Sequence, residues 1–312
     1  MCGIIGFTGT ADAAPIVLEG LKKLEYRGYD SAGVAVNGKD GIKMIKSSGK
    51  IENLCKKVAE AGGISGSTGI GHTRWATHGA PTDTNAHPHM TEDRRFAIVH
   101  NGIIENFAEL REELIAKGCI FKSETDTEVI VHLLSQYYEG NFKRALMKTV
   151  ARLEGSYAIG AVCSDFPESV FVTKALSPMI IGIGAGENFF ASDVTALVSH
   201  TKNVIYLEDG EIAELTPEEV IIYDAAGKPV EKKISRVAWD TEAAEKGGYE
   251  HFMLKEIMEQ PNALKAAIEP RIKNKKAFIP ELSFTKEELL GINHIIITAC
   301  GSAYYAGCAG KY

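Results

Sequence analysis

The thiol of Cys2 is the first side chain in this sequence that could act as a nucleophile. Cysteine is small enough for routine removal of the initiator Met1, which leaves a thiol and a free α-amino group on one residue. The amine has an unperturbed pKa of about 7.7–8.0 and the thiol one of about 8.5. Such an amine can serve as general base for its own side chain, directly or through a water. The alternative interpretation is that a cysteine stands at position 2 by chance.

The residues around Cys2 favour the nucleophile over a metal site. Gly3 allows close backbone approach beside the thiol, and Ile4-Ile5 predicts a buried strand that anchors it. The sequence has no helical His-x-x-x-His pair, no HExxH and no CxxC, so it predicts neither a metal nor a cofactor. The histidine spacing fits loops better. The histidines in question are His72, His78, His87, His89 and His100.

Helices and strands alternate in the first half of the chain. Apolar runs predict strands, and apolar residues at helical spacing predict helices. Asn37-Gly38 is a strong hairpin signal, and segment 125–128 resembles a capping box that opens a helix. The expected strands are 3–8, 32–36 and 42–47, and the expected helices contain 17–24, 51–59, 107–114 and 129–137.

From residue 156 to 224 the pattern changes to short strands separated by turns. Asp209-Gly210 is a second hairpin signal. Many strands with several helices in one domain predict two stacked sheets with helices outside. The expected strands are 157–163, 170–173, 179–183, 203–207, 211–215 and 220–223.

Composition excludes several classes of partner. The chain has 312 residues and a net charge of −7, with no block of lysine and arginine, which argues against a nucleic acid or an anionic membrane surface. No apolar run reaches the roughly 18 residues of a membrane span, and the N-terminus lacks a signal-peptide pattern. Six scattered cysteines argue against a disulfide framework. The expected location is the cytoplasm.

Five segments carry a resemblance to class II glutamine amidotransferases. The start, Cys2-Gly3-Ile4-Ile5-Gly6, is similar to the start of that family. The other four stand in the family's order and together resemble the glutaminase half of the glutamine–fructose-6-phosphate aminotransferase family, over residues 1–238. They are LEYRGYDSAG (24–33), GHTRWATHG (71–79), HNGIIEN (100–106) and SETDTE (123–128).

The resemblance implies an α+β fold, a four-layer αββα sandwich of the N-terminal-nucleophile hydrolase type. Cys2 should lie at the end of a central strand, with the site on loops at one sheet edge. It also implies that Asn101 and Gly102 stabilise the oxyanion formed when Cys2 attacks an amide. Without the resemblance, Asn101-Gly102 would indicate a type I′ turn.

Further site residues follow from the same resemblance. Arg74 would bind the α-carboxylate of glutamine and Asp126 its ammonium, although a surface salt bridge and a helix cap are the respective alternatives. The other implied residues are Thr77 and His78, which complete the substrate loop, Trp75, which gates the ammonia path, and Arg27, which orders the N-terminal site.

The remaining chain resembles later parts of the same family. Residues 239–282 are predicted to form a linker and two helices, 251–259 and 262–272, split by Pro261. Residues 283–312 resemble the start of a sugar isomerase domain, with a strand over 294–299 and a phosphate loop from Cys300 to Ala303. The family usually has serine where Ala303 stands. The sequence is therefore expected to be part of a protein about twice as long.

The predicted activity is hydrolysis of L-glutamine to glutamate and ammonia. In the longer protein, the resemblance implies transfer of that ammonia to fructose 6-phosphate, which yields glucosamine 6-phosphate, and a homodimer. One alternative is a glutaminase of the amidophosphoribosyltransferase type. The other is a glutamine-binding module without catalysis.

Overall fold

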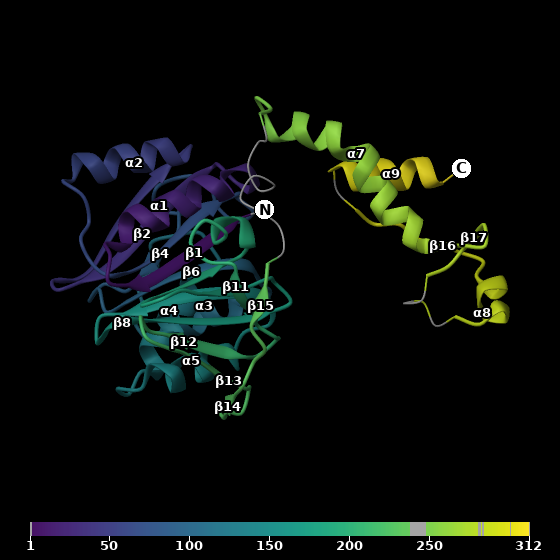
Figure 1. Cartoon of the computed structure of the whole chain (residues 1–312). Helices are drawn as coiled ribbons and strands as arrows, with labels where there is room; N and C mark the ends of the chain where they lie inside the picture. The colour runs from purple at the N-terminus through teal and green to yellow at the C-terminus, as the bar shows by residue number, and fades with distance from the viewer. Residues whose placement is uncertain (1, 238–247, 280–281, 283, 300, 312) are drawn as a thin grey trace. The chain divides into compact units, whose positions relative to one another are not determined.

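The computed structural model describes residues 2–237, 248–279, 282, 284–299 and 301–311. Contacts between Cα atoms divide the chain into two compact units, Met1–Gly247 and Gly248–Tyr312. The chain runs from purple to yellow in Figure 1, and the first unit holds every element that bears on the predicted site.

Two antiparallel sheets form the centre of the first unit (Figure 1). The strand order of the larger sheet is β15 (Ser235–Arg236), β11 (Asn203–Tyr206), β9 (Ile180–Ile183), β10 (Glu187–Ala191), β1 (Gly3–Gly9), β4 (Thr68–Arg74), β2 (Ser31–Gly38) and β3 (Gly41–Ser48). The order of the smaller sheet is β14 (Pro229–Val230), β13 (Val220–Tyr223), β12 (Ile212–Leu215), β8 (Phe166–Ala175), β7 (Gly155–Cys163), β6 (Phe96–Ile104) and β5 (His89–Met90).

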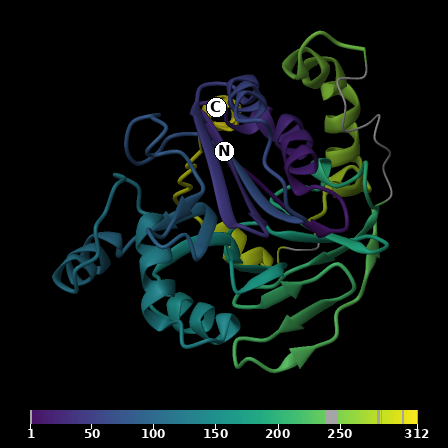
Figure 2. The same cartoon turned by 90° about the vertical axis from the view of Figure 1, so that its left-hand side faces the viewer.

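Helices cover the outer face of each sheet, as Figures 1 and 2 show. The larger sheet carries α1 (Ala13–Leu24) and α2 (Ile51–Glu60), with the short helices η1 (Glu25–Arg27) and η2 (Val194–Ala196). The smaller sheet carries α3 (Phe107–Ala116), α4 (Glu128–Tyr137) and α5 (Phe142–Val150). A third apolar cluster lies between the two sheets. The predicted four-layer αββα sandwich is confirmed.

Strand β1 shows why this sequence builds a central strand. Its side chains alternate: Ile5 and Phe7 pack in the cluster under α1, and Ile4 packs between the sheets. Gly6 leaves room for the ring of Phe190, which would lie 1.9 Å from a Cβ at that position. The strand is buried on both faces, so the residue before it is held in a fixed place.

The first hairpin is shifted relative to the prediction. Asn37 and Gly38 lie within β2, and Gly38 pairs with Gly41, so the turn is Lys39-Asp40. The strand runs on because the side-chain amide of Asn37 donates to the carbonyl of Cys163 on the other sheet, at 2.7 Å. A contact this distant in sequence outweighs the local turn preference of Asn-Gly.

The second predicted hairpin, at Asp209-Gly210, is also wrong. A turn does occur there, and Gly210 has φ +81°. The strands on either side belong to different sheets, however, since β11 pairs with β9 and β15 whereas β12 pairs with β8 and β13. The turn therefore carries the chain from one sheet to the other. In the first unit, the sequence prediction missed helix α5 and the strands β4, β5, β6, β10, β14 and β15.

The predicted capping box at 125–128 does not form. Helix α4 begins at Glu128, and its N-cap residue Thr127 makes no side-chain capping bond. The carboxylate of Glu128 instead accepts hydrogen bonds from the backbone N–H groups of Lys122 and Ser123, at 2.9 and 2.7 Å. These bonds hold the preceding loop rather than the helix end.

The second unit contains α7 (Phe252–Ile268), η3 (Glu269–Arg271), β16 (Ile272–Lys273), β17 (Lys276–Ala277), α8 (Lys286–Gly291) and α9 (Gly301–Gly310). The two predicted helices are one, because Pro261 inside α7 removes a single backbone donor without ending the helix. The predicted strand over 294–299 is wrong, since those residues pair with no strand among the described part of the chain. Cys300 and the predicted linker residues 239–247 lie outside the described residues.

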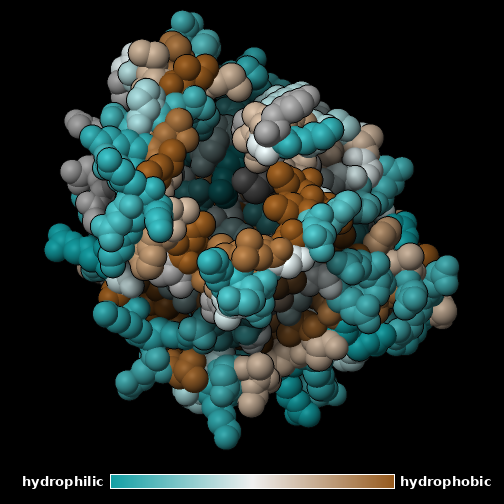
Figure 3. Space-filling view, turned by 90° about the vertical axis from the view of Figure 1, so that its right-hand side faces the viewer, coloured by the Kyte–Doolittle hydropathy of each residue, from teal (hydrophilic) through white to brown (hydrophobic). Residues whose placement is uncertain are grey.

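Large apolar side chains are exposed on the second unit, and Figure 3 shows apolar residues among the polar ones on its surface. Among its described residues only Lys255 is buried, so those residues contain no apolar core. Within the described ranges, no helix combines the length and the apolar character that a membrane span requires.

Candidate active site

Cys2 lies directly before β1, in the middle of the larger sheet, as predicted. Gly3 brings the strand against α1, because a Cβ there would lie 2.7 Å from the Cβ of Leu24. The backbone N–H of Trp75 donates to the sulfur of Cys2 at 3.2 Å. This N–H is placed to stabilise a thiolate. Met1, whose removal is predicted, lies outside the described residues.

Burial raises the pKa of the Cys2 thiol above its ordinary value. The Trp75 N–H and the Arg74 guanidinium lower that pKa, but they do not outweigh burial. The thiol therefore keeps its proton at neutral pH, and its attack on a substrate requires a base. The α-amino group of the same residue is the closest candidate once Met1 is absent.

A small cavity of about 20 Å³ lies beside the thiol. It brings together six of the nine predicted site residues, from segments that are distant in sequence. Those six are Cys2, Arg74, Trp75, Thr77, Gly102 and Asp126. Asn101 adjoins the cavity, because its side-chain amide donates to the carbonyl of Cys2 at 3.3 Å.

Asn101 and Gly102 lie in strand β6, paired with Ala158 and Tyr157 on β7. The type I′ turn that the dipeptide favours locally is therefore wrong. Gly102 has φ +132°, and a Cβ there would lie 2.0 Å from the carbonyl oxygen of Ser156. Only glycine can adopt this backbone conformation here. The position of the Gly102 N–H next to the cavity therefore depends on the absence of a side chain at this residue.

We predict that Gly102→Ala destabilises the fold by more than backbone strain alone, which costs about 1–3 kcal/mol. Gly118→Ala is a matched control, because Gly118 also has positive φ, +89°, but no atom lies within 4 Å of its Cβ position. Urea unfolding of both variants measures the difference. An equal loss of stability in the two would show that the Ser156 contact has no effect.

Arg74, the last residue of β4, is 4 % exposed, so the alternative of a surface salt bridge is wrong. Its guanidinium donates to the carbonyls of His78, Gly79 and Ala80, the latter two at 3.3 Å. Asp30 accepts from the N–H of Ala76 at 2.8 Å and holds the same loop from its other end. A carboxylate that binds Arg74 must share the guanidinium N–H groups with these carbonyl oxygens or displace them.

Asp126 is 5 % exposed and lies in the loop before α4. One of its carboxylate oxygens accepts from the backbone N–H of Ile104 at 2.8 Å, not from the helix end. The helix-cap alternative is therefore wrong. The same carboxylate lines the cavity. Because Asp126 is buried there, a cationic group that enters the cavity would be a favourable partner for it.

The remaining predicted residues lie at or beyond the cavity rim. Thr77 lines the cavity, whereas His78 packs edge-on against Phe107 with ring centroids 5.6 Å apart. Arg27 forms an ion pair with Asp193 at 3.0 Å and does not line the cavity. Trp75 is exposed and meets the ring of Tyr29 edge-on at 5.8 Å. The prediction that the site lies on loops is only partly right, because Arg74, Asn101 and Gly102 are strand residues.

A cluster of buried histidines at the cavity, three of which line it, was not predicted. The rings of His72 and His87 stack at 4.1 Å, and those of His87 and His89 meet at 4.8 Å. Burial lowers the pKa of each, that of His72 to about 3, so these rings are neutral. The predicted loop placement is wrong for His72, His89 and His100, which lie in strands. Five further residues line the cavity: His72, His87, His100, Thr125 and Thr127.

The local sequence gave little sign of these histidines' role. His72 and His100 stood inside the quoted motifs, but only the pairing of strands shows what their rings contact. In the described part of the chain, no group of three or more histidine, cysteine, aspartate or glutamate side chains converges to hold a metal ion.

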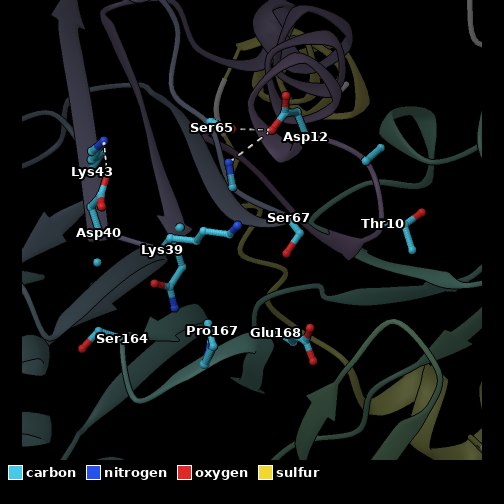
Figure 4. A pocket seen from close by; sticks show the side chains of 15 residues that line it. Thr10, Asp12, Lys39, Asp40, Lys43, Ser65, Ser67, Ser164, Pro167 and Glu168 are labelled. Atoms are coloured by element: carbon cyan, nitrogen blue, oxygen red, sulfur yellow. Dashed lines mark hydrogen bonds and ion pairs between the residues drawn. The ribbon is translucent and has the colours of Figure 1, made fainter.

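A larger cavity, of about 980 Å³, opens at the opposite end of β1 and is lined by Thr10. Two of its acidic residues have ordinary partners: Asp12 accepts from the Ser65 hydroxyl at 3.0 Å, and Lys43 pairs with Asp40 at 3.2 Å (Figure 4). Neither cysteine nor histidine is among its lining residues. The smaller cavity, not the larger, therefore has the groups for nucleophilic chemistry.

Sequence comparisons show which proteins this chain is similar to. The model of the glutamine amidotransferase domain matches residues 58–238. The chain is 50 % identical, over its full length, to the glutamine–fructose-6-phosphate aminotransferase (isomerizing) of Caldanaerobacter subterraneus, and 48 % identical to that of Thermus thermophilus. It spans about half the length, 51 %, of these curated relatives.

Solved structures with the same fold include the glutamine phosphoribosylpyrophosphate amidotransferase of B. subtilis, complexed with ADP and GMP. The TM-score is 0.64 and the identity 26 %, over 72 % of this chain and 49 % of that one. A structure described as the allosteric regulatory enzyme of purine biosynthesis matches with 27 % identity, the same TM-score and the same coverage. The identity to the aminotransferases is about twice as high. Given the domain match over more than half of its residues, the chain belongs to the glutamine amidotransferase family.

Proposed function

We propose that this chain hydrolyses the side-chain amide of L-glutamine to glutamate and ammonia, with Cys2 as nucleophile after removal of Met1. The observation that carries the proposal is the cavity itself: a thiol, a buried cation and a buried carboxylate line one small space. The thiol provides the nucleophile, and the two opposite charges match the carboxylate and ammonium of an α-amino acid.

The proposed reaction has two steps. The Cys2 sulfur attacks the amide carbon while its α-amino group accepts the thiol proton. The Asn101 amide and the Gly102 N–H donate to the resulting oxyanion. The α-ammonium group then protonates the leaving nitrogen, ammonia departs, and a thioester remains. Water then attacks the thioester while the amine accepts one of its protons. The ammonium group returns that proton to the departing sulfur, so that glutamate leaves and the thiol is restored.

Substrate recognition is proposed to use charges at both ends of the α-amino acid. Arg74 binds the carboxylate, Asp126 binds the ammonium, and Thr77 and His78 complete the substrate loop. Trp75 gates the ammonia path. A cavity of about 20 Å³ has room for about one water, so the loop that Arg74 holds must move when glutamine enters.

We predict that Asp126→Asn raises the KM for glutamine about 10- to 100-fold, because a charge-assisted hydrogen bond contributes about 1.5–3 kcal/mol. The asparagine oxygen can still accept from the Ile104 N–H, so the fold should survive. Steady-state kinetics gives the KM, and a thermal melt checks folding. An unchanged KM in a folded variant would exclude Asp126 as the ammonium ligand.

For the longer protein, we propose that the ammonia is transferred to fructose 6-phosphate, the acceptor in the relatives' names. Residues 1–238 would be the glutaminase domain, 239–282 a connecting segment and 283–312 the start of a sugar isomerase domain. Arg27, which pairs with Asp193 after β10, would keep the N-terminal strand in order. A cytoplasmic homodimer is the proposed state of the longer protein. The higher identity to the aminotransferases favours a sugar isomerase domain over a phosphoribosyltransferase domain as the second domain.

The test is to incubate a chain confirmed by intact mass to begin at Cys2 with L-glutamine. Glutamate and ammonia should appear in equal amounts. Glutamine affinity without release would support the non-catalytic binding module. Neither affinity nor release would contradict the proposed function.

A further inference from the structure

The amide of Asn101 can stabilise an oxyanion in only one of its two orientations. The NH₂ end donates a hydrogen bond, whereas the oxygen end would repel a developing negative charge. In the structure the NH₂ end faces the backbone of Cys2, with its nitrogen 3.3 Å from the Cys2 carbonyl oxygen. Some contact must therefore hold the oxygen end on the other side.

That contact is His72. Its Nε2 lies 3.0 Å from the side-chain oxygen of Asn101 and 3.1 Å from the backbone carbonyl oxygen of His100. Neither oxygen carries a hydrogen, so Nε2 must be the protonated nitrogen and must donate to both. Since the ring is fully buried, no bulk water competes for the Asn101 oxygen.

The surroundings fix the ring of His72 itself. His72 lies in β4, paired with Ile4 on β1 and Gly33 on β2, so its backbone is tied on both sides. Its ring stacks on that of His87 at 4.1 Å. Burial lowers its pKa to about 3, which keeps a single proton on the ring at neutral pH. The only buried polar atom of the ring without a partner is Nδ1, as expected for the Nε2-protonated tautomer.

We propose that His72 is a positioning residue for the reaction, which holds the Asn101 amide with its NH₂ end toward Cys2. This inference rests on the proposed function. His72 does not touch the reacting atoms through this contact. Its effect passes through Asn101, so loss of the His72 donor should slow the chemical step and leave glutamine binding almost unchanged.

The kinetic test compares two substitutions. His72→Leu removes the donor at similar volume, and we expect kcat to fall about 10- to 100-fold with KM within about twofold, in line with partial loss of one oxyanion donor. His72→Gln keeps an amide N–H near the position of Nε2 and should recover most of that loss. If His72→Gln is no better than His72→Leu, or if KM rises as much as kcat falls, the positioning role is wrong.

A control and a double substitution separate this role from general stability. His89 is similarly buried but contacts the Thr125 hydroxyl instead of Asn101. His89→Leu should therefore reduce the melting temperature as His72→Leu does, without the same loss of kcat. In an Asn101→Ala background, His72→Leu should change kcat less than twofold. If the losses of kcat caused by the two substitutions multiply in the double variant, the proposal is contradicted.

A spectroscopic readout is independent of activity. Long-range ¹H–¹⁵N correlation spectra of the intact chain report which nitrogen of His72 is protonated, and the side-chain NH₂ signals of Asn101 report its environment. We expect the Nε2-protonated tautomer, and a shift of the Asn101 signals in His72→Leu but not in His89→Leu. A Nδ1-protonated His72, or unmoved Asn101 signals, would overturn the inference. These spectroscopic results can be obtained even if the chain hydrolyses no glutamine. A lack of hydrolysis would count against the proposed function alone.

Discussion

Replacing Cys2 by alanine is expected to lower glutamine hydrolysis by about 10⁴-fold or more, the loss seen when a covalent nucleophile is removed. Alanine is also small enough for removal of Met1, so the variant keeps the free α-amino group and loses only the thiol. Cys2 is the only cysteine among the described residues that line the cavity, so no second thiol is placed to replace it. Release of glutamate and ammonia measures the effect.

Cys55→Ala is the matched control for that experiment. Cys55 is a half-buried thiol on α2 that packs in the outer apolar cluster, away from the cavity. Its replacement should leave the rate within about twofold. If Cys2→Ala retained the rate of the Cys55→Ala variant, Cys2 would not be the nucleophile.

The second large effect is expected for Asn101→Ala. Loss of one oxyanion-hole donor costs about 10²–10³ in kcat, and the KM for glutamine should change little, because the donor acts only after the carbonyl becomes tetrahedral. The backbone of Asn101 stays paired with β7, so the strand should survive the change. Steady-state kinetics of folded protein gives both constants.

Asn106→Ala is a suitable control for Asn101→Ala. Asn106 is a second asparagine of the same motif, and its side chain bridges the backbone of Arg152 and Glu154 rather than the cavity. This variant should lose stability but keep its kcat. A kcat for Asn101→Ala within about threefold of the unmodified chain would remove Asn101 from the oxyanion hole.

Much of the fold could be predicted because apolar periodicity is a local property. Helices α1 to α4 and most strands of the first unit follow directly from it. The errors arise where a distant contact outweighs a local preference. Asn37 continues a strand because it bonds to Cys163, and Glu128 holds a loop because its carboxylate meets the backbone of Ser123.

The site was predicted by resemblance and not by local pattern. Asn101-Gly102 favours a turn locally, and only the pairing of β6 with β7 makes it part of a strand. The role inferred for His72 had no sequence signal at all, because it depends on the packing of β4, in the larger sheet, against β6, in the smaller sheet. Such a contact is defined by the packing of the sandwich, which no short window of sequence contains.

The central claim is that Cys2 acts through its own α-amino group, and one comparison tests it most directly. Two chains of identical sequence from Cys2 onward are prepared, one beginning at Cys2 and the other retaining Met1 as confirmed by intact mass. Both are incubated with glutamine at the same concentration. We predict glutamate and ammonia from the chain that begins at Cys2 and almost none from the chain that keeps Met1, since an amide nitrogen cannot accept the thiol proton. Equal rates from the two chains would contradict the proposed role of the amine.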